Sequence, residues 1–573
     1  MKHHRWLWIP LLVLCFAEIG QAALRVAILG DRTGTADDSV FEKTLRDIDN
    51  LKPDLVITVG DLIEGPQPDA ESINREWDHV LERLAILSMP FYFVPGNNDV
   101  FNDTSRELYS KRTGVSAYYS FDAGSVHFIV LDVSQIRSYE NMGRDQIEWL
   151  SGDLEAHAAA PLTCVFLHKP FWLEAEQSGL PDDMHAVFVK GGVDWVFSGH
   201  YHNSAFMQKD GIRYQMIGSS GGHIGDNPDR GEFYQFGWFT VLDDAASCTI
   251  IRPGATEPGD HLPVSDLLAQ NAIDETLAAD FRIDAPGGGD RPVPMMVKNP
   301  GDTPFRGTFA WNDEGSAWQM SPHSGTFAIE GISSSLSFSA RQRGDTVYPL
   351  PRLAVNCTLP SGRAYTSFQR PGIRLTAAIP STGKPVTIDG RLLEKAWRKA
   401  VSIDEFGNPD GGISAIEATR VTMVHDEANL YIGMACSESE PQKMQVFGDR
   451  RDAPVFEGDC VFLMFWCGEP PETCVQIVLN PDGVILDQKG PLETAKDARP
   501  RLDAKWNGDI AVAAASEKGA WNLEIRIPLT ELDLAPGRTL RFNLIRFQSR
   551  LMDSASWSWP ATYSWEEAGI LTF

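Results

Sequence analysis

Five short motifs in the N-terminal part of the chain carry side chains that bind divalent cations. In chain order they are Gly30-Asp31-Arg32-Thr33, Gly60-Asp61, Gly96-Asn97-Asn98-Asp99, Leu167-His168 and Gly199-His200-Tyr201-His202. The candidate ligands are two carboxylates, one amide oxygen and three imidazoles, from Asp31, Asp61, Asn97, His168, His200 and His202. Mixed oxygen and nitrogen donors suit Fe, Mn or Zn better than Mg or Ca. A carboxylate that bridges two such cations holds them about 3.5–4 Å apart. The motifs therefore predict a centre with two divalent metal ions.

Each motif alone also has an ordinary structural interpretation. A Gly-Asp pair after a strand is usually a turn or a helix cap. A lone histidine such as His168 is more often a hydrogen-bonded core residue than a ligand, and His200 and His202 can be polar residues on one face of an extended segment. Five such coincidences in this order are improbable, so the metal centre is the favoured interpretation.

The elements that must position these side chains are short apolar runs between Leu24 and about Pro253. Each run ends in polar residues, and the runs are RVAILGD, DLVITVGD, PFYFVPGNND, HFIVLD, CVFLHK and WVFSGH. Helix-like stretches such as 40–51 and 74–87 lie between several of them. This alternation predicts an α/β fold with covered sheets. Ligands of such folds gather at the carboxyl ends of the strands, where the motifs stand.

The order of the motifs resembles the calcineurin-like metallophosphoesterase superfamily, whose pattern is D-x-H, G-D, G-N-H-D, a lone His and G-H-x-H. The resemblance covers roughly residues 24–253. It implies an αββα sandwich that hydrolyses phosphate esters or anhydrides with metal-bound hydroxide. It also implies that Asp31, Asp61 and His202 hold one metal, and that Asp61 bridges to a second metal completed by Asn97, His168 and His200.

Two positions depart from that pattern. The histidine of the first motif is Thr33 here, which either coordinates weakly or holds a water, so the first site is either empty or exchanges readily. The position of the family's general acid is Asn98, which donates a hydrogen bond but delivers no proton near neutral pH. Loss of a positioned acid costs on the order of 10²–10⁴ in rate. Phosphoanhydrides and aryl phosphates suffer least, because their leaving groups depart well as anions.

Two further residues near the motifs keep two interpretations each. His223 lies in the glycine-rich turn Gly218-Ser219-Ser220-Gly221-Gly222-His223. It either reaches the pocket as a substitute catalytic acid or is a solvent-facing loop residue. Arg32 binds phosphate oxygens or forms a surface salt bridge. His127 and His185 belong to no motif and are expected to be structural.

Behind residue 284 the sequence alternates in short strands separated by turns. A helix is expected at 269–281, and the Gly- and Pro-rich segment that follows it predicts a domain boundary. We expect the phosphoesterase domain at 23–284, a small β-sandwich at 285–372 that resembles immunoglobulin-like spacers, and a larger β-sandwich at 373–573. One short helix is expected at 394–399.

The last domain resembles a family 9 carbohydrate-binding module. The similar segments are 386–397 (VTIDGRLLEKAW), 457–462 (EGDCVF), 521–528 (WNLEIRIP) and 541–546 (RFNLIR). The resemblance implies a module that binds sugar chain ends between aromatic rings, with structural calcium for which Asp389 and Asp459 are candidates. The aromatic rings available are Trp506, Trp557, Trp559 and Trp565, each of which is more often a packing residue than a binding platform. Trp397 and Trp521 are expected to hold the sandwich together.

Bulk properties limit the partners. With 50 basic and 78 acidic residues, the net charge of −28 argues against nucleic acid as a binding partner.

Residues 1–22 have the pattern of an export signal. Lys2 and Arg5 precede the apolar stretch from Trp6 to Phe16, which is shorter than the roughly 20 residues of a membrane span. No later segment is long enough to span a membrane, and a periplasmic or extracellular location follows. Cys467 and Cys474 flank a hairpin, either bridged or free.

Together these observations predict an exported metallophosphoesterase with a dinuclear centre and activity reduced by Thr33 and Asn98. Its expected substrate is a phosphorylated small molecule or a phosphorylated glycan, and the last domain is expected to direct it to polysaccharide. Asp61, Asn98 and His223 are the candidate catalytic residues. The alternative is a catalytically impaired, metal-containing protein that recognises carbohydrate or phosphorylated ligands.

Overall fold

The computed structural model describes residues 23–573 apart from 68, 137–140, 226, 243–244, 279–280, 286–288, 300–303, 360, 415, 469–470, 493–499, 535–538 and 552. The expected export signal at 1–22 lies outside the described residues. Among the residues that are described, no helix is long and apolar enough to cross a membrane. The chain divides into two compact units, which meet in the sequence at Gln270 and Asn271.

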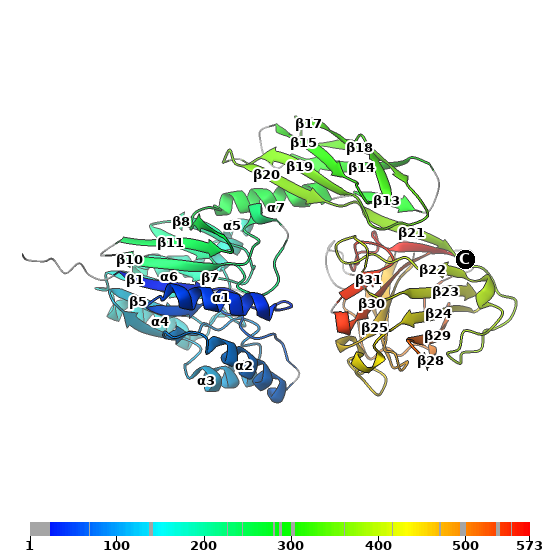
Figure 1. The fold of residues 1–573 in the computed structure, drawn as a ribbon, viewed down its shortest axis with the longest axis horizontal. Helices are drawn as coiled ribbons and strands as arrows, with labels where there is room; N and C mark the ends of the chain where they lie inside the picture. Colours follow the sequence, from blue (N-terminus) through cyan, green and yellow to red (C-terminus); the bar gives the residue numbers. More distant parts are fainter. Residues whose placement is uncertain are drawn as a thin grey trace, which may run out of the picture. The chain divides into compact units, whose positions relative to one another are not determined.

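The first unit contains two six-stranded sheets (Figure 1). The first sheet has the order β12-β11-β10-β1-β2-β3. Its strands are β1 (Leu24–Leu29), β2 (Leu55–Thr58), β3 (Phe91–Tyr92), β10 (Phe236–Leu242), β11 (Ala245–Arg252) and β12 (Ala255–Pro258). The second sheet has the order β4-β5-β6-β7-β9-β8. Its strands are β4 (Tyr119–Ala123), β5 (Val126–Val130), β6 (Leu162–Phe166), β7 (Trp195–Ser198), β8 (Ala205–Lys209) and β9 (Ile212–Met216). Strands β1 to β3, and likewise β5 to β7, run parallel.

Seven α-helices accompany these sheets in the described part of the chain. They are α1 (Asp38–Leu51), α2 (Ala70–Leu84), α3 (Asp103–Thr113), α4 (Arg144–Ala156), α5 (Phe171–Ser178), α6 (Asp183–Gly191) and α7 (Val264–Ala278). Phe41 and Trp77 of α1 and α2 pack against Ala27 and Leu29 on one face of β1. The other face of β1, with Val26 and Ile28, packs against the second sheet.

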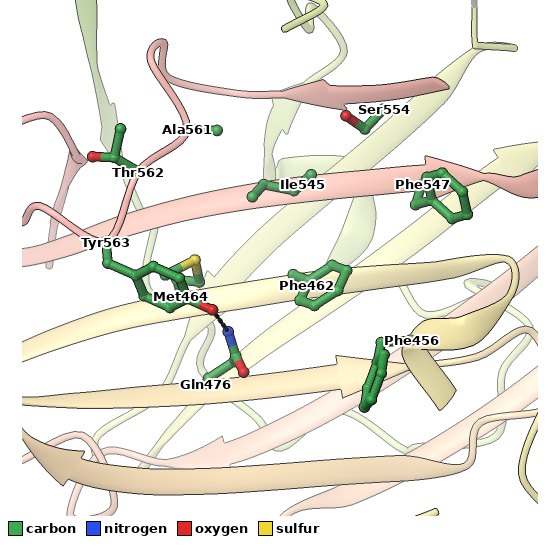
Figure 2. A pocket seen from close by; sticks show the side chains of 10 residues that line it. All are labelled: Phe456, Phe462, Met464, Gln476, Ile545, Phe547, Ser554, Ala561, Thr562 and Tyr563. Carbon is green, nitrogen blue, oxygen red and sulfur yellow. Dashed lines mark hydrogen bonds between the residues drawn. The ribbon is translucent and has the colours of Figure 1, made fainter. Parts of the chain in front are cut away.

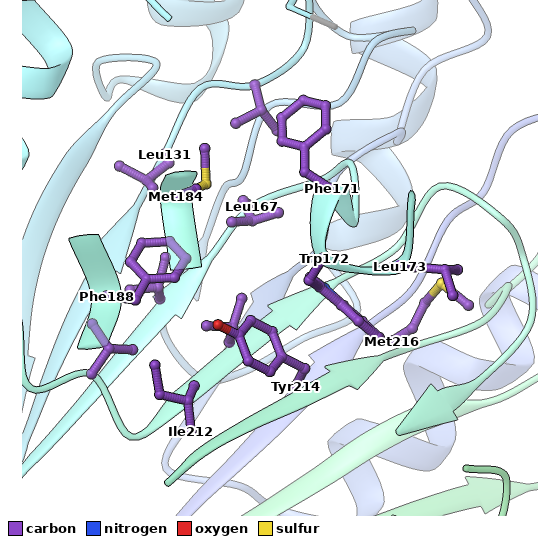
Figure 3. Close-up of a cluster of buried hydrophobic side chains, with 14 of the residues drawn as sticks. Leu131, Leu167, Phe171, Trp172, Leu173, Met184, Phe188, Ile212, Tyr214 and Met216 are labelled. Carbon is purple, nitrogen blue, oxygen red and sulfur yellow. The ribbon is translucent and has the colours of Figure 1, made fainter. Parts of the chain in front are cut away.

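The second sheet buries its outer face under α4, α5 and α6. Figure 3 shows part of this core, where Trp172 of α5 lies beside Tyr214 of β9, with ring centroids 5.4 Å apart. Met184 and Phe188 of α6 belong to the same buried cluster. The layers are therefore helix, sheet, sheet, helix, and the predicted α/β fold is confirmed. Each sheet is covered by helices on one face and by the other sheet on its second face.

Several helix ends differ from the sequence-based boundaries because capping side chains extend the helices. The side chain of Asp37 accepts hydrogen bonds from the backbone of Ser39 and Val40, so α1 starts at Asp38 instead of residue 40. Asp69 likewise accepts from the backbone of Ser72, and α2 runs over Ala70–Leu84 instead of 74–87. Helix α7 spans Val264–Ala278 instead of 269–281.

The second unit is rich in strands, as the alternating sequence predicts. A three-stranded sheet has the order β14-β18-β16, with β14 (Arg291–Lys298), β16 (Trp318–Ser321) and β18 (Ser333–Gln342). A four-stranded sheet has the order β17-β15-β19-β20, with β15 (Phe305–Asn312), β17 (Ser324–Ile329), β19 (Arg352–Thr358) and β20 (Ala364–Gln369). The ring of Phe338 in β18 meets those of Phe309 and Trp311 in β15, so the two sheets pack face to face.

Two larger sheets form the rest of this unit. The eight-stranded sheet has the order β13-β21-β32-β30-β25-β26-β27, with β31 paired to β30. Its strands are β13 (Arg282–Ala285), β21 (Gly372–Ala378), β25 (Cys460–Gly468), β26 (Pro471–Leu479), β27 (Ile485–Pro491), β30 (Thr539–Gln548), β31 (Asp553–Ser556) and β32 (Gly569–Thr572). The five-stranded sheet has the order β22-β23-β24-β29-β28, with β22 (Val401–Ile403), β23 (Thr419–His425), β24 (Asn429–Ser437), β28 (Ala511–Glu517) and β29 (Ala520–Pro528).

The two small sheets are inserted between neighbouring strands of the eight-stranded sheet. Strand β13 pairs in parallel with β21, and residues 291–369 lie between them in the sequence. Trp397 and Trp521 are buried, with 8% and 1% of their surfaces exposed, in agreement with a packing role. The guanidinium of Arg546, itself fully buried in β30, lies over the Trp521 ring of β29.

One local expectation for this unit needs correction, and one alternative that the sequence left open is settled. The helix expected at 394–399 is a single 3-10 turn, Trp397–Lys399, because the local hydrogen bonds join residues three apart, such as Trp397 N–H to the Glu394 carbonyl. Cys467 and Cys474 are free thiols. In the hairpin of β25 and β26, Trp466 pairs with Cys474 and Cys467 with Thr473, so the two cysteines point to opposite faces of the sheet.

Candidate metal centre

The predicted ligands come from both sheets of the first unit. Asp31, Asp61 and Asn97 follow the parallel strands β1, β2 and β3, and His168 and His200 follow β6 and β7. The carboxyl ends of parallel strands share one edge of their sheet, and here the edges of the two sheets meet. The backbone N–H of His200 donates to both carboxylate oxygens of Asp31, at 3.1 and 3.2 Å, across the two sheets.

His168 Nε2 lies at the middle of one group of donor atoms. It is 3.3 Å from Asp61 Oδ2, 3.1 Å from Asn97 Oδ1 and 3.2 Å from His200 Nδ1. Two ligand atoms that bind one cation at about 2.0–2.1 Å, with a tetrahedral angle between them, are about 3.3 Å apart. The separations of these four side chains therefore match those of ligands that share a cation.

The tautomer of His168 is set by the fold. Its Nδ1 lies 2.9 Å from the carbonyl oxygen of Val59, and a carbonyl only accepts, so Nδ1–H donates there and Nε2 is the nitrogen that faces Asp61, Asn97 and His200. Metal-binding histidines are normally held by such a bond from the second ring nitrogen. The rings of His168 and His200 are inclined at 78°, which lets both nitrogens point to one place. These residues fit a divalent metal.

A second group of donors contains Asp31 and His202. Asp31 is fully buried, and its Oδ1 is 3.7 Å from His202 Nε2. His202 Nδ1 donates to the carbonyl oxygen of His223 at 2.7 Å, which leaves Nε2 as the free nitrogen. Thr33 Oγ1 lies 3.3 Å from Asp61 Oδ2. The predicted ligands of the first metal are thus placed around Asp31, with the Thr33 hydroxyl beside them.

The backbone of the site is strained where the ligands stand. Asp61, His200 and His202 have φ angles of 57°, 79° and 60°, in the left-handed region that residues other than glycine rarely adopt. Such strain costs of order 1–3 kcal/mol per residue and collects at functional sites. Gly96 cannot be replaced by a larger residue without a clash, because a Cβ at this position would lie 2.0 Å from Asp61 Oδ1.

Asp99 holds the turn that carries Asp61, a role that the sequence analysis did not assign. Its carboxylate is fully buried and accepts backbone hydrogen bonds from Asp61 (2.7 Å), Leu62 (2.9 Å), Ile63 (3.1 Å) and Gly96 (2.9 Å). Burial raises the pKa of Asp99 to about 6. The sequence feature that could have indicated this role is the Asp at the end of the motif 96–99, since an acidic residue after a tight turn often accepts hydrogen bonds from backbone N–H groups.

The Asn98 side chain points at the ligand set. Its Nδ2 donates to Asp61 Oδ2 at 2.7 Å and to Thr33 Oγ1 at 3.2 Å, and its backbone N–H donates to Asp61 Oδ1 at 2.8 Å. The residue at the general-acid position therefore orients the central carboxylate. The amide carries no proton that it can give away near neutral pH.

Crowding of charged groups shifts several pKa values here. Burial raises the pKa of Asp31 to about 6. Burial acts in the same direction on Asp61, but the charge of His168 and the hydrogen bonds from His168 and Asn98 outweigh it and lower the pKa of Asp61 to about 2. Burial and the charge of His168 lower the pKa of His200 to about 4, so its imidazole is neutral near pH 7. A cation among these groups competes with protons, so its binding strengthens as the pH rises.

The structure shows the surroundings of Arg32 and His223, for which the sequence allowed two roles each. Arg32 is 3% exposed, donates to the Leu62 carbonyl oxygen and to Asp38, and lies over the ring of Phe41. The Arg32 guanidinium is therefore buried and paired with the partly exposed carboxylate of Asp38. The side chain of His223 is exposed, and its backbone carbonyl orients His202.

Two histidines outside the motifs are structural, as expected. His127 is buried between the carboxylates of Asp122 and Asp153, with both ring nitrogens at 2.8 Å. His185 contacts the hydroxyl of Tyr214 and the carboxylate of Asp210.

In the second unit, an open pocket of about 330 Å³ lies on the face of the eight-stranded sheet (Figure 2). Most of its lining is aromatic or aliphatic, from Phe456, Phe462, Met464, Ile545, Phe547 and Ala561, with Gln476, Ser554, Thr562 and Tyr563 as polar neighbours. The Gln476 amide donates to the Tyr563 hydroxyl at 3.3 Å. Its lining includes none of the four tryptophans named as candidate platforms, and Trp557 is 4% exposed.

The two candidate calcium ligands have protein partners. Asp389 belongs to a group with Glu394 and Glu524 whose ligand atoms lie within 4.8 Å of one another. The Glu524 carboxylate is buried and accepts hydrogen bonds from the backbone of Asp389 and Gly390 and from the Trp397 indole. Asp459 accepts from the Gln445 backbone at 2.9 Å and from the Ser549 hydroxyl. No calcium is assigned to either place.

The family model described as Calcineurin-like phosphoesterase matches residues 24–204. Purple acid phosphatase 23 of Arabidopsis thaliana is 30% identical over 220 residues, which cover 31% of this chain and 46% of that protein. Serine/threonine-protein phosphatase CPPED1 of Bos taurus is 30% identical over 178 residues, which cover 27% of this chain and 55% of that protein. The chain thus spans about half the length of these relatives, and the residues matched by the family model lie in the first unit.

Two solved structures are among those with some similarity to this chain. Purple acid phosphatase PPD1 from yellow lupin is 16% identical with a TM-score of 0.33, over 42% of this chain and 53% of that one. A family 9 carbohydrate-binding module from Caldicellulosiruptor kristjanssonii in complex with cellotriose is 14% identical with a TM-score of 0.23, over 34% of this chain and 92% of that one. Neither score is high enough to assign a fold.

Proposed function

We propose that the calcineurin-like phosphoesterase domain at the N-terminus of this chain is a metal-dependent hydrolase of phosphate esters or anhydrides. The observation that carries the proposal is the arrangement of Asp61, Asn97, His168 and His200. His168 Nε2 lies 3.1–3.3 Å from a donor atom of each of the other three side chains, and ligand atoms of Asp61, His168 and His200 lie within 4.8 Å of one another. The phosphatases among the relatives support the same reaction class.

When bound, two divalent cations of the Fe, Mn or Zn kind would polarise the phosphoryl oxygens and lower the pKa of the attacking water. The protein residues prepare this site in advance. Asp99 fixes the turn of Asp61, and Asn98 orients the Asp61 carboxylate through its amide. The chain places no acidic proton at Asn98, so the leaving group departs as an anion. Substrates with stable anionic leaving groups, such as aryl phosphates and phosphoanhydrides, are therefore favoured.

We also propose export of the protein, and carbohydrate recognition by its last domain. The N-terminal pattern at 1–22 supports export. The pocket with Phe456, Phe462 and Phe547 supports recognition of a sugar, because ring faces pack against sugar C–H surfaces while Gln476 offers an amide. In this proposal the immunoglobulin-like pattern of 285–372 is a spacer, and the substrate is a phosphorylated small molecule or a phosphorylated glycan.

A binding protein without turnover is the second candidate, because Thr33 and Asn98 replace two residues of the family pattern. Metal analysis combined with a substrate panel separates the two functions. We expect two metals per chain after supplementation with Mn, Fe or Zn, and hydrolysis of at least one class among monoesters, diesters and anhydrides. One metal or none, without turnover at any pH tested, would support the binding protein and reject the hydrolase.

Carbohydrate recognition is tested by replacing the most exposed ring of the pocket. Phe456 is 50% exposed, and we expect Phe456→Ala to weaken binding of the full-length protein to a soluble polysaccharide by about 3- to 10-fold, as judged by calorimetry. Ile332→Ala is the matched control, since Ile332 is 88% exposed and lies outside the pocket. Equal binding by both variants, or no binding by the wild type to any polysaccharide tested, would contradict the assignment.

A further inference from the structure

We propose that Tyr201 is the surface on which the leaving group of the substrate rests, so that the centre favours phosphate esters of aromatic alcohols. This inference rests on the proposed phosphoesterase function and adds a substrate class to it. Tyr201 lies between two candidate ligands, His200 and His202, in the segment that follows β7.

The position of the ring beside a metal ligand is the first observation. The Tyr201 ring centroid is 5.0 Å from that of His200, with the rings inclined at 61°. The residue is nevertheless 46% exposed, whereas His168 is fully buried and Asp61 is 2% exposed. This exposed ring, one residue from two candidate ligands, is available to contact a bound substrate.

The second observation is that the ring is held in place. The Tyr201 hydroxyl donates to Glu174 Oε1 at 3.2 Å. Glu174 belongs to α5. Trp172 and Leu173 of the same helix directly precede Glu174 and are buried in the core that Figure 3 shows. A ring fixed in this way loses little conformational freedom when a ligand stacks on it.

The chemistry of the ring points to planar leaving groups. Aromatic rings attract one another in offset or edge-to-face contacts beyond the effect of buried area. An aryl alcohol also departs as a stable anion, and Asn98 supplies no proton to a poorer leaving group. The two requirements arise independently, since Asn98 follows β3 of the first sheet and Tyr201 follows β7 of the second. Both favour an aryl phosphate over an alkyl phosphate.

Binding of two phosphonates that the protein does not hydrolyse tests this inference apart from catalysis. Phenylphosphonate and cyclohexylphosphonate share the phosphonate group and differ in the planarity of the ring. We expect the zinc-loaded full-length protein to bind phenylphosphonate about 3- to 10-fold more tightly, as measured by calorimetry. Tyr201→Ala should abolish this preference, and Tyr201→Phe should keep most of it because the ring remains.

Leu180→Ala is the control, because it removes another exposed side chain (68% exposed) of the same unit, and it should keep the wild-type preference. A wild-type protein without preference, or a preference that survives in Tyr201→Ala, would overturn the role of Tyr201. Hydrolysis of phenyl phosphate is measured in parallel. A stacking preference would keep Tyr201 as a ligand contact even if no monoester, diester or anhydride is hydrolysed, an outcome that would reject only the proposed function. Binding of neither phosphonate would reject the role of Tyr201.

Discussion

Asp61→Asn lowers kcat/KM by more than about 10²-fold and removes bound metal. Replacing residues that only support a ligand typically costs 10- to 100-fold in metal affinity or activity, so the loss of the central carboxylate costs more. Asp61 Oδ2 is 3.3 Å from His168 Nε2, and the same carboxylate accepts the Asn98 amide. A neutral amide in its place reduces the negative charge that attracts two cations.

The substitution is designed to preserve the fold. Asparagine has the shape of aspartate and tolerates the left-handed backbone, in which Asp61 has a φ of 57°. The backbone N–H of residue 61 continues to donate to Asp99. The metal-free variant should therefore unfold at a temperature close to that of the metal-free wild type, and added Mn or Zn should raise the unfolding temperature of the wild type only. A variant that retains two metals and more than about a tenth of the activity would contradict the role of Asp61 as the shared ligand.

Asn98→His raises turnover, and the gain is largest for alkyl phosphates. A positioned general acid contributes about 10²–10⁴-fold, an upper bound for this variant. Alkyl leaving groups gain the most because they are poor anions, whereas aryl leaving groups need little protonation. The imidazolium form delivers the proton, so the gain should be present below the pKa of the new histidine, ordinarily about 6.5, and should decline above it. Rate profiles against pH for phenyl and ethyl phosphate provide the measurement.

Asn98→Ala is the matched control for this substitution. It removes the amide that donates to Asp61 Oδ2 and Thr33 Oγ1 without adding an acid, so it should lower turnover of both substrates alike. Metal content of both variants must be measured, because Asn98 orients a metal ligand. Equal gains on aryl and alkyl substrates in Asn98→His would show that residue 98 does not face the leaving group.

The fold class of the first unit was predictable because it depends on local pattern, and the same pattern is the basis on which the ligand set is predicted. Apolar runs that end in polar residues identify strands with polar side chains at their carboxyl ends. Five such runs in order are the basis for predicting Asp31, Asp61, Asn97, His168, His200 and His202 as ligands. The described strands confirm those runs, and the α/β organisation follows from their alternation with helices. Helix boundaries were less accurate, because Asp37 and Asp69 cap α1 and α2 earlier than the apolar pattern begins.

Roles that depend on distant contacts were not predictable. From the sequence, Arg32 could bind phosphate or form a surface ion pair. In the structure the packing of α1 and α2 buries the Arg32 side chain, which pairs with Asp38. The hydrogen bonds of Asp99 to the turn at Asp61 join residues 38 apart. The pairing of β25 with β26 separated Cys467 from Cys474 by placing them on opposite faces of one sheet.

By itself, the sequence determined which donor atoms this protein offers to a cation and that each one stands at the end of a strand. Side-chain chemistry and strand endings are local properties, and residues near in the sequence are sufficient to read them. Only the tertiary structure decided which donors face each other, because His200 and Asp31 are 169 residues apart and meet only because the two sheets pack against each other. The same packing aimed the Asn98 amide at Asp61 and left the Tyr201 ring open to solvent.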